Sequence, residues 1–366
     1  MAARALAGYA ADPRHRVRRA PGGKRRRRAP HALRRGPRRA GLTGCSFKNP
    51  CGTADTRRAC FAIRETGAKE GKLKVGVIGL GLLGTAIAKR LMQAGVEVAG
   101  YDVDEAKRAA IAQLGARPVA SIGQAVRECA ALVLAVFNTE QVEEVVEGRA
   151  GIRDTIGESR TSPLVICMST CDPDRLAALA ARAGPRGVRL LEVPVSGTSR
   201  QVAQGDGVGL VGGERALMEE AAPVLDAICP RRHYLGATGS GSRAKLAVNL
   251  ILGLNRAALA EGLAFAERLG LDPVAFLEVA RGSAAYSQVM DVKGPLMARR
   301  EFRDPQSRVD QSLKDFKLML AQARAAGQEL PFAALYAQML EDCMRRGEGE
   351  WDNAAIIEAI RRCRAS

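Results

Sequence analysis

The chain has 366 residues, enough for two domains with sizeable cores, and its formal net charge of +17 is high enough to suggest a nucleic-acid-binding protein. The charge is unevenly placed, because residues 1–70 contain 19 Lys and Arg against 4 Asp and Glu, whereas residues 71–366 carry only +2. The longest apolar stretch, Ala130–Phe137, is far shorter than the ~20 residues that span a bilayer. No continuous apolar run in the sequence is long enough to indicate a membrane-spanning segment, and the composition excludes a uniformly basic chain.

Residues 1–70 are predicted to be a disordered basic tail. They contain the arginine run Gly23–Arg28, few large apolar residues and no helical or strand period. A nucleic-acid arm, a nuclear signal and an organellar transit peptide are the functional alternatives. A nucleic-acid arm would be better supported by interleaved aromatic residues, and residues 1–70 offer only Tyr9 and Phe47. A transit peptide is usually rich in serine, and Ser46 is the single serine before residue 60. We therefore favour a non-functional extension, and nucleic-acid binding is disfavoured.

The nine cysteines are scattered and form no CxxC pair, so neither a disulfide framework nor a zinc knuckle is indicated. A reducing, cytoplasmic location is the simplest expectation.

Residues 74–84, KVGVIGLGLLG, predict a dinucleotide-binding turn. A buried strand enters Gly79-x-Gly81-x-x-Gly84, and a helix ending at Gly95 follows. The three glycines permit a tight turn, close approach of a pyrophosphate and close helix–sheet packing, while the helix N-terminus faces the phosphates. A second strand, Val96–Tyr101, leads to Asp102, where a carboxylate would receive the ribose hydroxyls of NAD. The predicted cofactor-binding residues of the turn are Gly79, Leu80, Gly81, Leu82, Leu83 and Gly84.

Further strands at Ala131–Val136, Leu164–Met168, Arg189–Val193 and Val208–Gly212 alternate with helices, which predicts a doubly wound, mostly parallel Rossmann sheet over residues 71–236. After Gly236 the pattern becomes helical. It begins with a long inter-domain helix over Ser242–Leu269 and continues as an all-α C-terminal domain, residues 237–366. The apolar faces exceed what one small domain can bury, so we expect a homodimer or homotetramer.

A dehydrogenase that oxidises an alcohol needs a group that takes up the hydroxyl proton. The only histidine after residue 70 is His233, which is better interpreted as structural, and no cluster has metal-ligand spacing. Lys245 lies in the apolar run AKLAVNLILGL, with Asn249 four residues later on the same helical face. Burial in a cleft would lower the pKa of Lys245 toward the working range, whereas a lysine that snorkels from a core helix would be inert. The residues alone leave both interpretations open.

The order of the motifs resembles the β-hydroxyacid dehydrogenase family, which includes 3-hydroxyisobutyrate dehydrogenase and tartronate semialdehyde reductase. The resemblance runs from residue 72 to the C-terminus and rests on GLGLLG, PVSGT with a glycine-rich strand, GSGSRAKLAVN, LKDF and GEGEWDNAAI.

The resemblance implies a role for each matching residue. Lys245 would be the catalytic acid/base, supported by Asn249. Ser196, Gly197 and Thr198 would bind the substrate carboxylate. Besides the glycine turn and Asp102, the cofactor would contact Phe137, Asn138, Thr170 and Lys314. Thr198 stands where relatives usually have glycine, and Val248 replaces the first residue of an Asn-Asn pair.

These implications predict an NAD-dependent oxidoreductase, with NADP less favoured, that interconverts a small 3-hydroxy acid and its semialdehyde without a metal. Two alternatives remain at this stage. One is a non-catalytic NAD-binding scaffold whose basic tail binds nucleic acid, and the other is an imine reductase-like enzyme.

Overall fold

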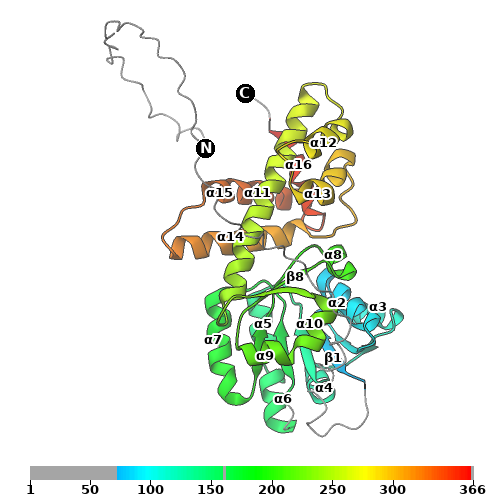
Figure 1. The fold of residues 1–366 in the computed structure, drawn as a ribbon, viewed down its shortest axis with the longest axis vertical. Helices are drawn as coiled ribbons and strands as arrows, with labels where there is room; N and C mark the ends of the chain where they lie inside the picture. Colours follow the sequence, from blue (N-terminus) through cyan, green and yellow to red (C-terminus); the bar gives the residue numbers. More distant parts are fainter. Residues whose placement is uncertain (1–71, 160–161, 364–366) are drawn as a thin grey trace, which may run out of the picture. The chain divides into compact units, whose positions relative to one another are not determined.

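The computed structural model describes residues 72–159 and 162–363 (Figure 1). The predictions for the basic tail fall outside the described residues. Within them, the chain forms an α/β part built on a parallel sheet and a helical part that follows it, as predicted.

Six parallel strands form the main sheet, in the order β3-β2-β1-β4-β5-β6. The inner strands β1, β4 and β5 are apolar and almost fully buried, as expected for a parallel sheet covered on both faces. The chain reverses direction across the sheet between β1 and β4, which places the switch point, where such sheets bind ligands, beside β1. The strands are β1 Lys74–Ile78, β2 Glu97–Tyr101, β3 Arg117–Pro118, β4 Ala131–Leu134, β5 Leu164–Cys167 and β6 Arg189–Glu192.

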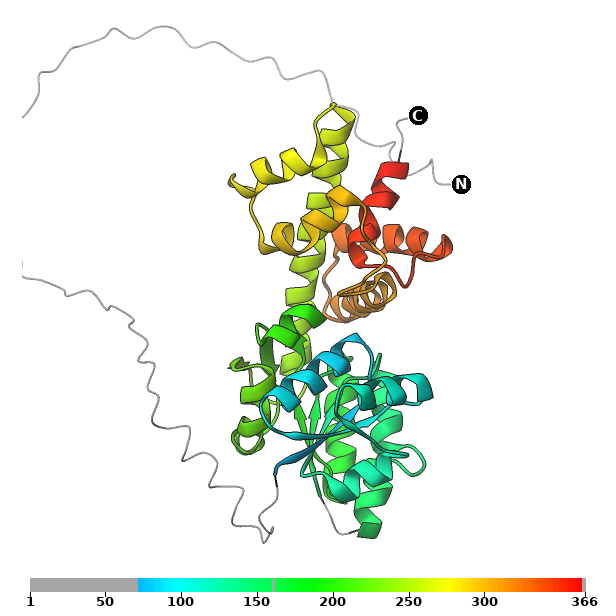
Figure 2. The same cartoon turned by 90° about the vertical axis from the view of Figure 1, so that its right-hand side faces the viewer.

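Helices cover both faces of this sheet, and each face has its own apolar core (Figures 1 and 2). The side chains of β1 alternate between them, so Val75 and Val77 enter one core and Ile78 the other. On the first face lie α2 (Leu82–Gln93), α3 (Glu105–Gln113) and α10 (Ala222–Ile228); on the second lie α4 (Ile122–Glu128), α5 (Thr139–Glu147), α6 (Ile152–Ser159) and α7 (Pro173–Ala183).

The strand expected at Val208–Gly212 does not extend the main sheet. It forms β8 (Val208–Val211) in a second sheet of order β7-β8-β9, with β7 at Val195–Ser196 and β9 at Arg231–Tyr234. The connection from β7 to β8 contains only the six-residue helix α8 (Ser199–Gln204), so β8 returns antiparallel to β7. The elements β7, α8 and α6 were not predicted from the sequence.

Between β8 and β9 the alternating pattern of strands and helices predicts one helix, and the structure forms two, α9 (Arg215–Glu220) and α10. Pro223 explains the division, because proline lacks the N–H that a continuous helix needs and instead occupies the first turn of α10.

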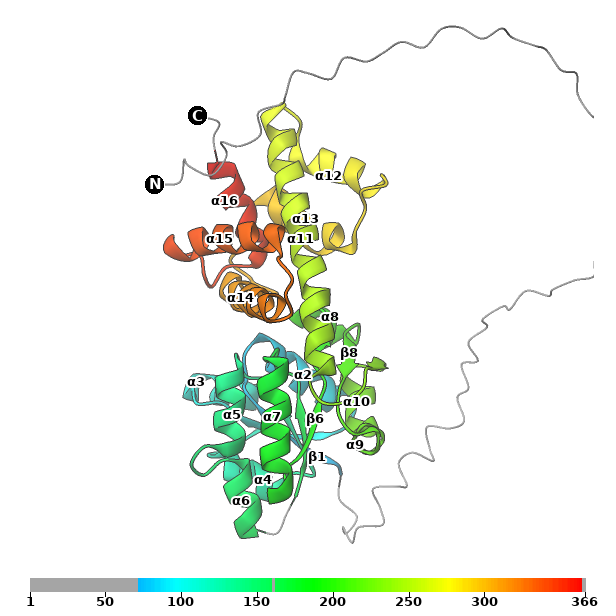
Figure 3. The same ribbon diagram turned by 90° about the vertical axis from the view of Figure 1, so that its left-hand side faces the viewer.

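The helical part is organised along α11, which runs from Ser240 to Arg268 as one helix of 29 residues (Figure 3). Its neighbours are α12 (Pro273–Arg281), α13 (Gln288–Arg299), α14 (Val309–Ala325), α15 (Pro331–Arg345) and α16 (Ile356–Arg362). A β-carbon at Gly253 would lie 2.4 Å from the ring of Phe316, so glycine there lets α14 approach α11 closely. A third apolar core fills this part.

By length and composition, α11 is the one helix in the described ranges that could cross a membrane. Core helices of soluble proteins meet the same criterion. Helix α11 contacts five helices of this part and carries the buried Lys245, so it is the central helix of the helical part.

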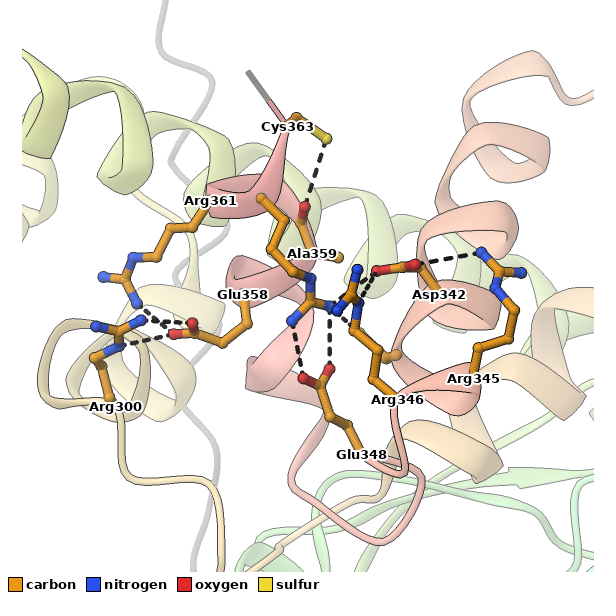
Figure 4. Close-up of polar contacts among 11 residues, drawn as sticks. Arg300, Asp342, Arg345, Arg346, Glu348, Glu358, Ala359, Arg361 and Cys363 are labelled. Atoms are coloured by element: carbon orange, nitrogen blue, oxygen red, sulfur yellow. Dashed lines mark hydrogen bonds and ion pairs between the residues drawn. The ribbon is translucent and has the colours of Figure 1, made fainter. Parts of the chain in front are cut away.

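Ion pairs hold the last helix, α16, to the elements around it (Figure 4). Arg362 pairs with Glu348 at 2.8 Å and with Asp342 at 3.0 Å, and Glu358 accepts from both Arg300 and Arg361. Burial opposes ionisation of Glu358, but Arg300 and Arg361 outweigh it and hold the pKa of this carboxyl below its usual value.

Candidate active site

The glycine turn after β1 has the geometry that a dinucleotide requires. Gly79 adopts φ +92°, and a β-carbon there would lie 2.7 Å from the Ala135 carbonyl oxygen, so only glycine fits without strain. A β-carbon at Gly84 would overlap the Gly79 carbonyl, whereas one at Gly81 would meet nothing within 4 Å. Gly81 also begins α2 without a side-chain cap, which leaves the first N–H groups of this helix available to a phosphate.

Asp102 lies directly after β2 and is 8% exposed. Its carboxylate accepts hydrogen bonds from Leu80 N at 2.7 Å and Asp104 N at 2.9 Å, and Lys107 Nζ lies 3.8 Å away. These contacts fix the carboxylate against the glycine turn, which is where the ribose of a dinucleotide bound at this turn would sit.

Residues from α14 reach the ends of β4 and β5. Lys314 Nζ donates to the carbonyl oxygens of Phe137 at 2.9 Å and Thr170 at 3.2 Å, and it lies 5.4 Å from the centre of the Phe137 ring. Asn138, the residue after Phe137, caps α5 by accepting from Gln141 N at 2.9 Å. The structure therefore brings Phe137, Asn138, Thr170 and Lys314 together.

Lys245 is 7% exposed and lies in the second turn of α11. Its Nζ donates to the Val195 carbonyl oxygen at 2.7 Å, next to Ser196. Burial lowers the pKa of Lys245 to about 8; the carboxylate of Asp315 acts in the opposite direction, and the cation of Lys314 acts with burial. A buried amine with this pKa exists in both protonation states near neutral pH, whereas a snorkelling lysine would keep its amine in water.

Asn249 makes no hydrogen bond to Lys245 in the structure. Its Nδ2 donates to Asp315 Oδ2 at 3.0 Å, and the other oxygen of Asp315 pairs with Lys314 Nζ at 2.9 Å. Asp315 thus joins Asn249 to Lys314, two residues that were predicted from the sequence, although Asp315 itself was not predicted. Its position in the LKDF motif was the available signal.

Ser196 ends β7, and Gly197 and Thr198 follow it as a turn. Gly197 has φ +143°, a conformation that favours glycine. The Thr198 hydroxyl accepts from Gln201 N at 3.2 Å while the Gln201 side chain accepts from Thr198 N, which forms a capping box at the start of α8. Threonine in place of glycine therefore stabilises the helix that follows this turn.

A carboxylate that was not predicted, Glu192, fixes the beginning of α11. Glu192 is fully buried and accepts from the backbone N–H groups of Gly239, Gly241 and Ser242 at 2.8, 3.1 and 2.7 Å. These N–H groups have no partner within the helix, and the negative charge of Glu192 lies at the positive end of the helix dipole, where it is stabilising. Because Val195 follows three residues later, one segment holds both the start of α11 and the amine of Lys245.

In the described ranges, no group of three or more His, Cys, Asp or Glu side chains is placed to hold a metal. His233 is exposed on β9.

Comparisons with known proteins agree with this arrangement. Residues 74–236 match the family described as the NAD binding domain of 6-phosphogluconate dehydrogenase, and residues 239–360 match the family described as NAD-binding of NADP-dependent 3-hydroxyisobutyrate dehydrogenase. The chain is 30% identical over 292 residues to 2-hydroxy-3-oxopropionate reductase of Escherichia coli, which covers 79% of this chain and 97% of the relative. It is 32% identical over 285 residues to L-threonate dehydrogenase of Cupriavidus necator, 78% and 95% of the two chains.

Among solved structures, 3-hydroxyisobutyrate dehydrogenase from Salmonella typhimurium superimposes with a TM-score of 0.71 at 28% identity, over 78% of this chain and 99% of that one. The fold, the glycine turn and these relatives define a nicotinamide-dependent dehydrogenase that acts on CH–OH groups. The chain belongs to the β-hydroxyacid dehydrogenase family. The scaffold and imine-reductase alternatives are not favoured.

Proposed function

We propose that this enzyme interconverts a small 3-hydroxy acid and its semialdehyde, with Lys245 as the acid/base. The observation that carries the proposal is the buried amine of Lys245, which lies beside the Ser196–Thr198 turn and has a pKa of about 8. The named relatives support the substrate class, since one reduces 2-hydroxy-3-oxopropionate and another oxidises L-threonate.

In this proposal the substrate carboxylate binds to the Ser196 hydroxyl and to the backbone N–H of Gly197, with Thr198 beside them. Neutral Lys245 accepts the hydroxyl proton as the alcohol is oxidised, and the protonated amine returns it in the reverse reaction. Val195 orients the amine through its carbonyl oxygen, and burial keeps water from competing for the proton.

The glycine turn and Asp102 would hold the adenosine half of the cofactor, and Phe137, Asn138, Thr170 and Lys314 would lie along the rest of it. When bound, a nicotinamide dinucleotide supplies the acceptor for the hydride. We propose NAD rather than NADP, because a carboxylate at Asp102 receives ribose hydroxyls but repels a 2′-phosphate.

A panel of short 3-hydroxy acids, followed by the absorbance of reduced cofactor, tests this proposal. Lys245→Ala should abolish turnover on every acid that the wild type accepts while cofactor binding persists. Lys317→Ala, which removes an exposed lysine paired with Glu341, is the matched control and should retain activity. Near-normal turnover by Lys245→Ala would reject the assignment.

We also propose that the protein is a homodimer or homotetramer. Large apolar side chains remain exposed on α11, α12 and α15, more than isolated surface residues would account for. They include Phe265 (63% exposed), Leu269 (63%), Val279 (67%) and Phe332 (74%). Sedimentation analysis at micromolar concentration tests this, and a monomer would refute it.

For its location we propose the cytoplasm. The six cysteines in the described ranges are free thiols, five of them buried, which suits a reducing compartment. Fractionation of cells that produce the full chain tests this proposal.

A further inference from the structure

The helical part contains a buried ion pair that takes no part in the proposed chemistry. Lys293 of α13 is 3% exposed, Asp352 is fully buried, and the lysine Nζ lies 2.8 Å from both carboxylate oxygens. Burial lowers the pKa of Lys293 to about 8, although Asp352 raises it. A buried ion pair is costly to desolvate and is often no more stabilising than apolar side chains of similar size. The stability of the fold alone therefore does not explain why this pair is present.

Asp352 also organises the segment that links α13 to α14. Its Oδ2 accepts from Gln306 N at 2.8 Å and from Ser307 N at 3.4 Å, while Asp352 N donates to the Phe302 carbonyl oxygen at 2.8 Å. The carboxylate can hold both N–H groups of this segment because Lys293 balances its charge. We call residues 302–307 the linking segment.

The linking segment in turn contacts the α/β part next to the proposed carboxylate-binding turn. The Gln306 carbonyl oxygen accepts from Ser199 Oγ at 3.1 Å and from Ser199 N at 3.4 Å. Ser199 follows Thr198 directly. A second, exposed contact joins Arg200 and Asp304 at 3.2 Å.

We infer that Lys293 and Asp352 are positioning residues: through Gln306 and Ser199, the buried pair holds the turn that binds the substrate carboxylate. The inference rests on the proposed function of Ser196–Thr198. The contacts run from α13 to Asp352, from Asp352 to Gln306, and from Gln306 to Ser199. Each step is a hydrogen bond between groups far apart in sequence. The local conformational preferences of the chain would therefore not hold these groups in place if one hydrogen bond were lost.

Hydrogen exchange on the full chain tests the contacts independently of activity. Lys293→Met should raise exchange of backbone amides over residues 196–204 by about tenfold, because local opening of α8 loses a constraint. A pair that only stabilises its own surroundings would raise exchange near residues 302–310 and 352–357 and leave residues 196–204 unchanged. That second pattern would overturn the inference. Lys317→Met is the matched control, since Lys317 forms an exposed ion pair with Glu341 in the same helical part.

Kinetics provide the second readout. Lys293→Met should raise KM for the hydroxy acid by about tenfold with little change in kcat or in the dissociation constant of the cofactor, as expected when only substrate binding is weakened. Adding Ser199→Ala to Lys293→Met should raise KM no further, because both changes interrupt the same contacts. Full additivity would contradict the inference.

If Lys293→Met does not fold, Ser199→Ala alone still tests the inference, because it removes the shorter hydrogen bond to the Gln306 carbonyl oxygen and leaves only the 3.4 Å bond from the backbone N–H. It should raise both the exchange of residues 196–204 and KM. Wild-type values for both would overturn the inference. A wild type without activity on any hydroxy acid would instead refute the proposed function, while the exchange result would still test the contacts.

Discussion

Glu192→Gln tests how the start of α11 is fixed. One carboxylate oxygen accepts from Gly239 and Gly241 and the other from Ser242, all in a fully buried setting. Glutamine keeps one acceptor oxygen, but its NH2 group replaces the other oxygen and faces a backbone N–H. Two donors then face each other, and the hydrogen bond at that position is lost. Hydrogen bonds to a buried charge contribute roughly 1.5–3 kcal/mol each and neutral ones about half as much, so losing one and weakening two should cost at least about 3 kcal/mol.

Thermal unfolding followed by calorimetry measures this cost. For a fold of this size, about 3 kcal/mol lowers Tm by roughly 6–12 °C. The control is Glu214→Gln, because Glu214 is exposed and, among the described residues, makes no side-chain cap to α9 although it occupies the same position before a helix. Its Tm should stay within about 2 °C of wild type. Equal Tm values for the two variants would refute the role of Glu192.

Three further predictions follow from single residues. Asp102→Arg should shift the ratio of kcat/KM values toward NADP, and an unchanged ratio would show that Asp102 does not contact the ribose. Gly253→Ala should destabilise the fold by about 1–3 kcal/mol through overlap with Phe316, whereas Gly262→Ala on the same helix meets nothing within 4 Å and should stabilise it by up to about 1 kcal/mol. The lowered pKa of Glu358 stabilises the fold above pH 4.5, the ordinary value, and this contribution is lost as pH falls through the folded-state pKa. Glu358→Gln should therefore flatten the acid limb of a plot of Tm against pH, and an unchanged limb would contradict this.

The sequence predicted the elements whose signals are local. The glycine turn lies between a buried strand and a helix, and α11 shows an unbroken apolar period, so both could be located before the structure was known. Elements with weak local signals were missed: β7 has two residues, and α8 has six. Pro223 is a local signal for the break between α9 and α10, although this break was not predicted from the sequence.

The same distinction applies to the site. Lys245 attracted attention because a charge stood in an apolar run, which is a local observation. Glu192 had no such signal, since its importance comes from N–H groups about 50 residues later in the chain. Asp315 acts on Asn249 across 66 residues, and Lys293 pairs with Asp352 across 59. Contacts of this kind appear only when the tertiary structure is known.

Two buried lysines have a pKa of about 8, so a pH profile must separate them. Lys293→Arg keeps the pair with Asp352 charged throughout the neutral and alkaline range, because arginine does not lose its proton there. Any titration that persists in this variant does not belong to residue 293.

The most direct test of the account is the pH dependence of kcat/KM for alcohol oxidation, measured in the wild type and in Lys293→Arg. Lys245 must be neutral to accept the hydroxyl proton, so kcat/KM should rise with pH through a pKa of about 8 in both proteins, and it should level off above that pKa in Lys293→Arg, in which residue 293 keeps its charge. The reverse reaction should show the opposite dependence. A flat profile between about pH 6.5 and 9.5, or a rise that disappears in Lys293→Arg, would contradict the claim that the buried amine of Lys245 moves the proton.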